Sequence, residues 1–378
     1  MNAIDYIPRV ARNAHLWVPG FLSEQWRRRL AAPQNGPPKR VWLLLADHFE
    51  PLWRGASIGT AHHRVQRWRE KWPEIAGRHR DHAGRRPQYT FFYPEEQYEP
   101  QLLDLLAETK DLGVGDVEVH LHHDRDTEAA FVDRLGRFLD ALSVRHGLLR
   151  RHGERVVFGF VHGNWALDNS RPDGRYCGLN NEISLLSKLG CYADFTLPSA
   201  PSAAQTRTVN TIYWATDDPD LPRSHERGVP VLPGGGIDGD LMIIPGPLTF
   251  LCKGSGHPWP RLEVGELNAQ EPVTVARVRS WLRCAPCIGN DLFLKLFTHG
   301  AQEANAEMLL EGGLDDCLRL LSEICRQSGI KLHFVTAWEM RRVIDALRER
   351  RSPEEVVFNP SGIQNAPDDK LATTRCES

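Results

Sequence analysis

Histidine and carboxylate side chains follow four apolar runs of this sequence, at the point where each run ends. The runs lead into DHFE (47–50), HLHHDRD (120–126), HGNW (162–165) and THG (298–300). Imidazole and carboxylate groups are the ligands of zinc and similar divalent ions, and they also act as general acids and bases. A single histidine in such a place is often only a polar residue whose hydrogen bonds are made within the protein. Four together predict a metal-dependent hydrolytic site.

These side chains need a fold that brings distant segments together. We expect strands at 41–46, 89–93, 116–122, 155–161, 192–197, 291–299 and 331–336, with helices at 60–75, 100–113, 127–152, 181–190, about 300–328 and after 336. Strands that alternate with helices are typical of parallel β–α–β units. Chemistry in such folds lies at the carboxyl ends of the strands. The number of units favours an α/β fold of the distorted β/α-barrel type.

The chain divides into three parts by composition. Residues 1–39 contain a helical extension and a Pro/Gly-rich linker, and residues 40–350 form the expected catalytic barrel. Residues 351–378 are polar and lack periodicity, so we expect a disordered tail.

Charge and cysteine content narrow the classes of partner and compartment. The net charge is −3, which does not favour a nucleic-acid partner. The apolar runs are too short to span a bilayer, and the N-terminus does not resemble a signal peptide, so we expect a cytoplasmic protein. The eight cysteines, including the CxxC of Cys284 and Cys287, show no secreted framework and are interpreted as reduced thiols. We infer no oligomeric state from these patterns.

The order of the segments resembles the NodB-like polysaccharide deacetylase superfamily of glycoside hydrolases and deacetylases. Ala46-Asp47-His48 stands where the family has an Asp-Asp pair, Thr90-Phe91-Phe92 matches its TFF strand, Glu118-Val119-His120-Leu121-His122 aligns with E-I-G-x-H, and Phe297-Thr298-His299 stands where L-H-D would be. The likeness covers about residues 40–340. It departs from the family at His48, at His120, at Asp126 and in HGNWALDNS, which lacks the expected Arg.

The resemblance implies a fold, a cofactor and roles for particular residues. It implies a distorted barrel of the NodB type and one divalent ion, zinc by default, bound by His48, His122 and Asp126. It also implies Asp47 as general base and His299 as general acid. The alternate ligands are His120, His123 and Asp124, because the register across 118–126 could slip by two residues.

The implied activity is the deacetylation of a carbohydrate, either a polysaccharide or its precursor. Polar and aromatic residues beside the proposed ligands are candidates for binding this substrate: Glu50, His162, Asn164, Trp165, Asp168 and Asn169. Trp165 is the residue that could stack on a sugar ring, whereas Asn and Asp at these places also favour turns.

Two other functions stay open. His120 and His122 stand at i and i+2, so they point to one face of a strand, as in metal-dependent amidohydrolases with a β/α barrel. That pair usually closes the first strand of such barrels, whereas here it closes the third. The departures from the family motifs also suit a non-catalytic carbohydrate-binding relative. Metal content measured together with turnover separates the three functions.

Overall fold

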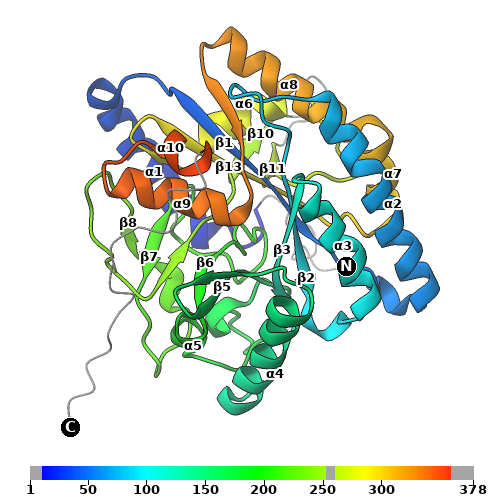
Figure 1. Cartoon of the computed structure of the whole chain (residues 1–378). Coiled ribbons are helices and arrows are strands. Elements are labelled where there is room, and N and C mark those ends of the chain that lie inside the picture. The colour runs from blue at the N-terminus through cyan, green and yellow to red at the C-terminus, as the bar shows by residue number, and fades with distance from the viewer. Residues whose placement is uncertain (1–10, 253–259, 359–378) are drawn as a thin grey trace, which may run out of the picture.

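The computed structural model describes residues 11–252 and 260–358, which hold a mixed α/β fold built on one large sheet (Figure 1). The parallel centre of the sheet contains β1 (Arg40–His48), β2 (Tyr89–Pro94), β3 (Gly115–Leu121), β5 (Arg155–His162), β6 (Cys191–Asp194) and β13 (Asp291–Thr298). Hydrogen bonds join these strands in the order β13, β1, β2, β3, β5, β6. The polar segments that follow β1, β3, β5 and β13 therefore lie along one edge of the sheet, as predicted.

Shorter strands extend this centre on both sides. Next to β6 lie β9 (Leu241–Ile243), β7 (Tyr213–Ala215) and β8 (Val229–Pro230), and β12 (Cys287–Ile288) is antiparallel to β13. β14 (Lys331–Phe334) pairs with the first half of β1, and β4 (Arg150–His152) pairs with β5. β10 (Thr249–Leu251) and β11 (Arg261–Glu263) form a separate pair. In the large sheet, the path of paired strands begins at β12 and ends at β8. Closure of this sheet into a barrel of the NodB type stays a prediction.

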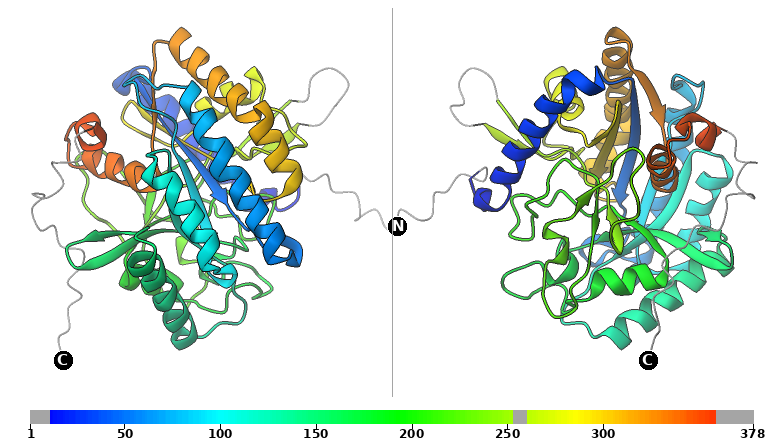
Figure 2. Two further views of the ribbon diagram at one scale, coloured as in Figure 1. Left: turned by 45° about the vertical axis from the view of Figure 1, so that its right-hand side comes forward. Right: turned by 90° about the vertical axis from the view of Figure 1, so that its left-hand side faces the viewer.

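Helices cover both faces of the sheet. They are α1 (Ala14–Asn35), α2 (Ile58–Arg78), α3 (Pro100–Asp111), α4 (Glu128–Asp140), α5 (Glu182–Leu189), α6 (Val275–Cys284), α7 (Glu303–Met308), α8 (Leu314–Gln327), α9 (Ala337–Arg348) and α10 (Pro353–Phe358). Figure 2 shows α2, α3 and α8 along one side, away from α9 and α10. Ser57, Thr127 and Thr336 begin α2, α4 and α9, because each hydroxyl accepts a hydrogen bond from a backbone N–H of the first turn.

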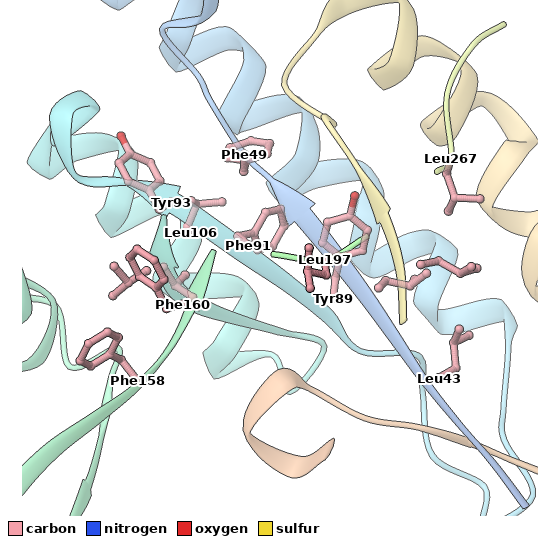
Figure 3. Packing of buried hydrophobic residues seen from close by; sticks show 14 of the residues in the cluster. Leu43, Phe49, Tyr89, Phe91, Tyr93, Leu106, Phe158, Phe160, Leu197 and Leu267 are labelled. Atoms are coloured by element: carbon pink, nitrogen blue, oxygen red, sulfur yellow. The ribbon is translucent and has the colours of Figure 1, made fainter. Parts of the chain in front are cut away.

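The first face of the sheet packs against α2 and α3. Neighbouring residues of a strand point to opposite faces, so every second residue of β1, beginning with Val41, enters this core. Figure 3 shows Phe49, which follows β1, beside Tyr89 and Phe91 of β2, with Leu43 further back along β1. The rings of Phe49 and Phe91 are 5.0 Å apart between centroids, and those of Tyr89 and Phe91 are 4.9 Å apart.

The second face of the sheet carries the alternate residues of the same strands. Trp42, Leu44 and Ala46 of β1 belong to a core that includes Met340 and Ile344 of α9. The two cores together explain why the central strands are apolar on both faces, as parallel strands usually are. The same alternation decides to which face a side chain at the end of a strand points.

Three segments differ from the elements expected from the sequence. The helix expected at about 300–328 is divided into α7 and α8 by a break at Glu311 and Gly312. The helix expected over 127–152 ends at Asp140, a π-turn follows, and the segment 150–152 forms β4. Gly147 and Gly153 have positive φ and flank this strand, which lets the chain turn back onto β5. Residues 353–358 of the expected disordered tail form α10, where Val357 packs into the second core. Residues 359–378 lie outside the described residues.

Candidate active site

Three histidines from three strands form a cluster at the carboxyl edge of the sheet. His48 closes β1, His120 lies near the end of β3 and His299 follows β13. The ring centroid of His48 is 5.2 Å from that of His120 and 5.0 Å from that of His299. His48 and His120 are fully buried, whereas His299 is half-buried.

Glu50 joins this cluster to His122. Its Oε1 lies 3.4 Å from Nε2 of His120 and 3.2 Å from Nε2 of His122. One ligand atom from each of these three residues lies within 4.8 Å of the others, and we call the group the Glu50 centre. Two imidazoles and one carboxylate can hold a divalent cation and leave coordination positions open. The His122 side chain is 28% exposed, so solvent reaches the centre from this side.

Glu96 holds His122 from the side away from Glu50. Its Oε1 is 2.5 Å from His122 Nδ1, and its Oε2 accepts a hydrogen bond from the His122 backbone N–H. Burial lowers the pKa of His122, but the hydrogen bonds to Glu50 and Glu96 outweigh this effect and raise the pKa to about 9. Burial alone would raise the pKa of Glu50, but hydrogen bonds from His120 and His122 bring it well below its usual range. The centre therefore holds opposite charges at neutral pH.

Unpartnered nitrogens show what else the cluster can accept. Both ring nitrogens of His48 and Nδ1 of His120 are buried, and within the part of the chain that the structure describes they have no hydrogen-bond partner. Buried polar atoms are normally satisfied, so these nitrogens suit a cation, a water molecule or a substrate. Burial lowers the pKa of His48 well below its ordinary value, and nearby positive charge adds to this. The imidazole is therefore neutral, which is the form that binds metals or accepts a proton.

Trp165 lies beside the cluster in a strained backbone conformation. Its ring centroid is 6.3 Å from that of His48 and 6.2 Å from that of His299. Its φ is 56°, and Asp168 and Asn169 also have positive φ in the same loop. Such conformations cost of order 1–3 kcal/mol each for residues other than glycine, and they gather at functional sites. The structure thus brings the predicted Trp165 to the predicted His48 and His299.

Asp47 lies at the same edge but on the opposite face from His48. Its carboxyl group accepts a 2.9 Å hydrogen bond from the Tyr89 hydroxyl and a 2.7 Å hydrogen bond from the Gly300 N–H. Burial raises the pKa of Asp47 to about 8, against the lowering effect of these two bonds. The structure therefore does not place the predicted base beside the Glu50 centre, because successive residues of β1 point to opposite faces.

Asp126 and Asp124 also lie apart from the predicted partners. Asp126 has one carboxylate oxygen 3.3 Å from His123 Nδ1 and forms an ion pair with Arg134. The carboxylate of Asp124 accepts a hydrogen bond from the backbone of Tyr176. The predicted ligand set of His48, His122 and Asp126 is thus not brought together, because the chain turns after β3 and directs Asp126 toward α4.

The remaining predicted substrate-binding residues stay in or under the loop after β5. His162 accepts a 3.2 Å hydrogen bond from the Asn164 N–H, and Asn164 itself is half-exposed. Asp168 is buried and accepts a hydrogen bond from the Ser224 N–H. Asn169 donates to Asn180 within the loop. The bonds of Asn164 and Asn169 stay within the loop, as the turn chemistry that the sequence also allowed, whereas the bond of Asp168 joins the loop to the distant Ser224.

From the sequence, Glu50 is expected to bind substrate, and no motif points to Glu96. Glu50 stands two residues after His48, so its position was visible although its role was not. Glu96 lies in a short turn after β2 (residues 95–97), where its spacing to His122 carries no ligand pattern. Only the pairing of β2 with β3 brings these residues together.

Comparison with known proteins adds little to this geometry. No family model matches the chain, and no curated protein matches it. A solved structure of 4-α-glucanotransferase from Thermococcus litoralis is similar over 80% of this chain with 11% identity and a TM-score of 0.40. The chain spans about two fifths of the length of that protein, since the match covers 40% of it. Membership of the NodB-like superfamily stays an expectation from motif order.

In the described ranges, none of the helices combines the length and the apolar character that crossing a bilayer requires. The cysteines that the structure describes, including Cys284 and Cys287, form no disulfide bonds.

Proposed function

We propose that this protein is a metal-dependent hydrolase that removes an acyl group from a carbohydrate, with N-acetyl groups as the preferred target. The Glu50 centre carries the proposal, because two histidine nitrogens and a carboxylate oxygen converge at a partly exposed edge. Neutral, unpartnered His48 and half-buried His299 lie beside it.

Glu50, His120 and His122 would hold the divalent ion, with zinc as the default. This set differs from the one implied by the family motifs, because Asp126 contacts His123 and Arg134 instead. When bound, the ion would lower the pKa of a water ligand and polarise the acyl oxygen of the substrate. Glu96 accepts the Nδ1 proton of His122 and so keeps Nε2 directed toward Glu50.

The histidines beside the centre supply the proton transfers. Both ring nitrogens of His48 are unpartnered and the ring lies beside His120, so His48 is positioned to accept a proton from water. His299 approaches from β13 and can donate a proton to the departing amine. Asp47 acts as a positioning residue, because its bond to the Gly300 N–H orients the turn that carries His299.

A sugar ring is the substrate group that suits the surroundings of the centre. The half-exposed Trp165 ring lies beside His48 and His299, and half-exposed Asn164 precedes it. An aromatic face provides apolar contact for a sugar ring, while the amide of Asn164 can hydrogen-bond to hydroxyl groups.

Acetate release from N-acetylated oligosaccharides tests the proposal. The protein is stripped with a chelator, reloaded with Zn²⁺ and compared with the variants His120→Ala and Glu50→Gln. Both variants should lose metal from the Glu50 centre, and turnover should fall at least about 100-fold. Removing a residue that hydrogen-bonds to a metal ligand typically costs about 10- to 100-fold, and removing the ligand itself should cost more. His152→Ala, at an exposed site on β4, should change neither quantity. Full turnover by metal-stripped protein would overturn the proposal.

The pair of His120 and His122 also supports a second candidate function, that of a metal-dependent amidohydrolase. His120 and His122 both direct Nε2 to one oxygen of Glu50, as an HxH pair does at a metal centre. Hydrolysis of small amides without hydrolysis of N-acetylated sugars would favour this function. Saccharide binding without any turnover would favour the non-catalytic relative.

A further inference from the structure

A second group of ligand-type side chains lies on the other side of β3 and β5. His123 follows β3, His162 closes β5, Cys177 lies in the loop after β5 and Glu182 begins α5. All four side chains are buried, and one ligand atom from each lies within 4.8 Å of the others. His162 belongs to the first face of the sheet because it alternates with Val161, which belongs to the second core.

Glu182 is the centre of this group. Its Oε1 lies 3.0 Å from Nε2 of His123 and 3.9 Å from Nε2 of His162. Its Oε2 lies 3.3 Å from Sγ of Cys177. The ring centroids of His123 and His162 are 4.6 Å apart.

Two independent observations indicate that this group can bind a ligand. Nε2 of His162 is buried and, among the described residues, has no hydrogen-bond partner. Asp126 lies 3.3 Å from Nδ1 of His123, on the side of the ring away from Glu182. Histidines that bind metals through one nitrogen usually present the other to a carboxylate or a carbonyl group.

We propose that His123, His162, Cys177 and Glu182 form a closed structural site for a second divalent cation of the zinc class. Thiolate and imidazole are the ligands that zinc prefers, and four protein ligands leave no position for substrate. This proposal does not depend on the function proposed for the Glu50 centre.

Binding requires two proton changes that the residues can make. The thiol of Cys177 must release its proton to solvent, because the thiolate is the ligand. Nδ1 of His162 must carry the ring proton, so the 3.2 Å hydrogen bond from the Asn164 N–H would be given up. The cation would then tie the loop that carries Trp165 to the ends of β3 and β5. The Asp126 N–H, which donates to the Cys177 carbonyl, already links these segments.

The same distances also fit a buried ion pair without a cation. In that arrangement His123 is protonated against Glu182, and the thiol of Cys177 donates to the same carboxylate. Cobalt separates the two arrangements, since a Co²⁺ ion bound to thiolate gives a near-ultraviolet charge-transfer band that the Glu50 centre, without cysteine, cannot produce.

The experiment loads metal-stripped full-length protein with Co²⁺ and records the spectrum and the number of ions bound. We expect two equivalents and a thiolate band for the native protein. Cys177→Ser should lose the band and one equivalent. His122→Ala should lose the other equivalent and keep the band, so failure of the Glu50 centre is distinguishable from failure of this site.

Two cysteine variants are the controls. Cys317→Ser, at a buried position in α8, and Cys287→Ser, in the CxxC, should keep the band and both equivalents. A native spectrum without a thiolate band, or a band that disappears in Cys287→Ser, would overturn the proposal. These two spectra decide the matter even if Cys177→Ser does not fold.

Discussion

The backbone N–H of Gly300 donates a 2.7 Å hydrogen bond to Oδ1 of Asp47. A Cβ atom at Gly300 would collide with the Asp47 carboxyl group and with the ring of Trp68. The Trp68 indole in turn donates a hydrogen bond to the Gly300 carbonyl group. The carboxyl end of β13 is therefore held against β1 and α2, and this contact sets the position of His299.

Gly300→Ala should disturb this contact. We expect a loss of about 1–3 kcal/mol in the free energy of unfolding, the usual cost of overpacking, together with a lower kcat because His299 moves. Gly77→Ala is the matched control, since nothing lies within 4 Å of a Cβ atom there. Urea unfolding and acetate release measure the two effects, and equal behaviour of both variants would contradict the proposed positioning.

Asp47 should make stability depend on pH. Burial raises its pKa from 3.8 to about 8, so the folded protein holds a proton that the unfolded chain releases between these values. The contribution is complete below about pH 4 and is lost as the pH rises through 8, with a slope of at most about 1.4 kcal/mol per pH unit. Asp47→Asn cannot titrate and should flatten this slope in urea unfolding of metal-stripped protein. An unchanged slope would show that Asp47 is ionised in the folded state.

Glu96→Gln should weaken metal binding at the Glu50 centre without abolishing it. The variant removes the carboxylate that accepts the Nδ1 proton of His122, and such losses typically cost about 10- to 100-fold in affinity. Glu95→Gln is the neighbouring control, because Glu95 faces Arg134 instead. Competition with a metal indicator measures both affinities, and no difference between the variants would contradict the supporting role.

Trp165 should contribute to substrate binding but not to metal binding. Trp165→Ala and Trp165→Gly both remove the ring beside His48 and His299, so both should raise KM for oligosaccharides at unchanged metal content. Glycine tolerates a φ of 56°, so Trp165→Gly should be about 1 kcal/mol more stable than Trp165→Ala. Equal KM values for native protein and both variants would remove Trp165 from the substrate site.

His299→Ala should slow the hydrolysis of substrates with poor leaving groups more than the hydrolysis of substrates with good leaving groups. A general acid assists departure of an amine far more than departure of an activated phenol, and its loss typically costs about 10²- to 10⁴-fold. The ratio of amide to activated-ester hydrolysis is the measurement, with metal content as the control. An equal loss for both substrates would assign His299 to substrate binding or to the metal.

The sequence alone determined the strands and their polar ends. The expected strands at 41–46, 89–93 and 155–161 appear as β1, β2 and β5, because their apolar composition and flanking turn residues are local signals. The parallel arrangement of β1, β3 and β13 within the sheet then placed His48, His120 and His299 at one edge.

Tertiary structure decided which of these side chains meet. Glu50 reaches His120 and His122 across about 70 positions of sequence, and Glu182 collects His123, His162 and Cys177 on the other face. The direction of each side chain depends on strand parity and on the turn that follows the strand. A shift of one residue moves a side chain to the opposite face, as Asp47 and His48 show. Residue types and motif order do not specify the direction of a side chain. The grouping into the Glu50 centre and the Glu182 group therefore became visible only in the folded chain.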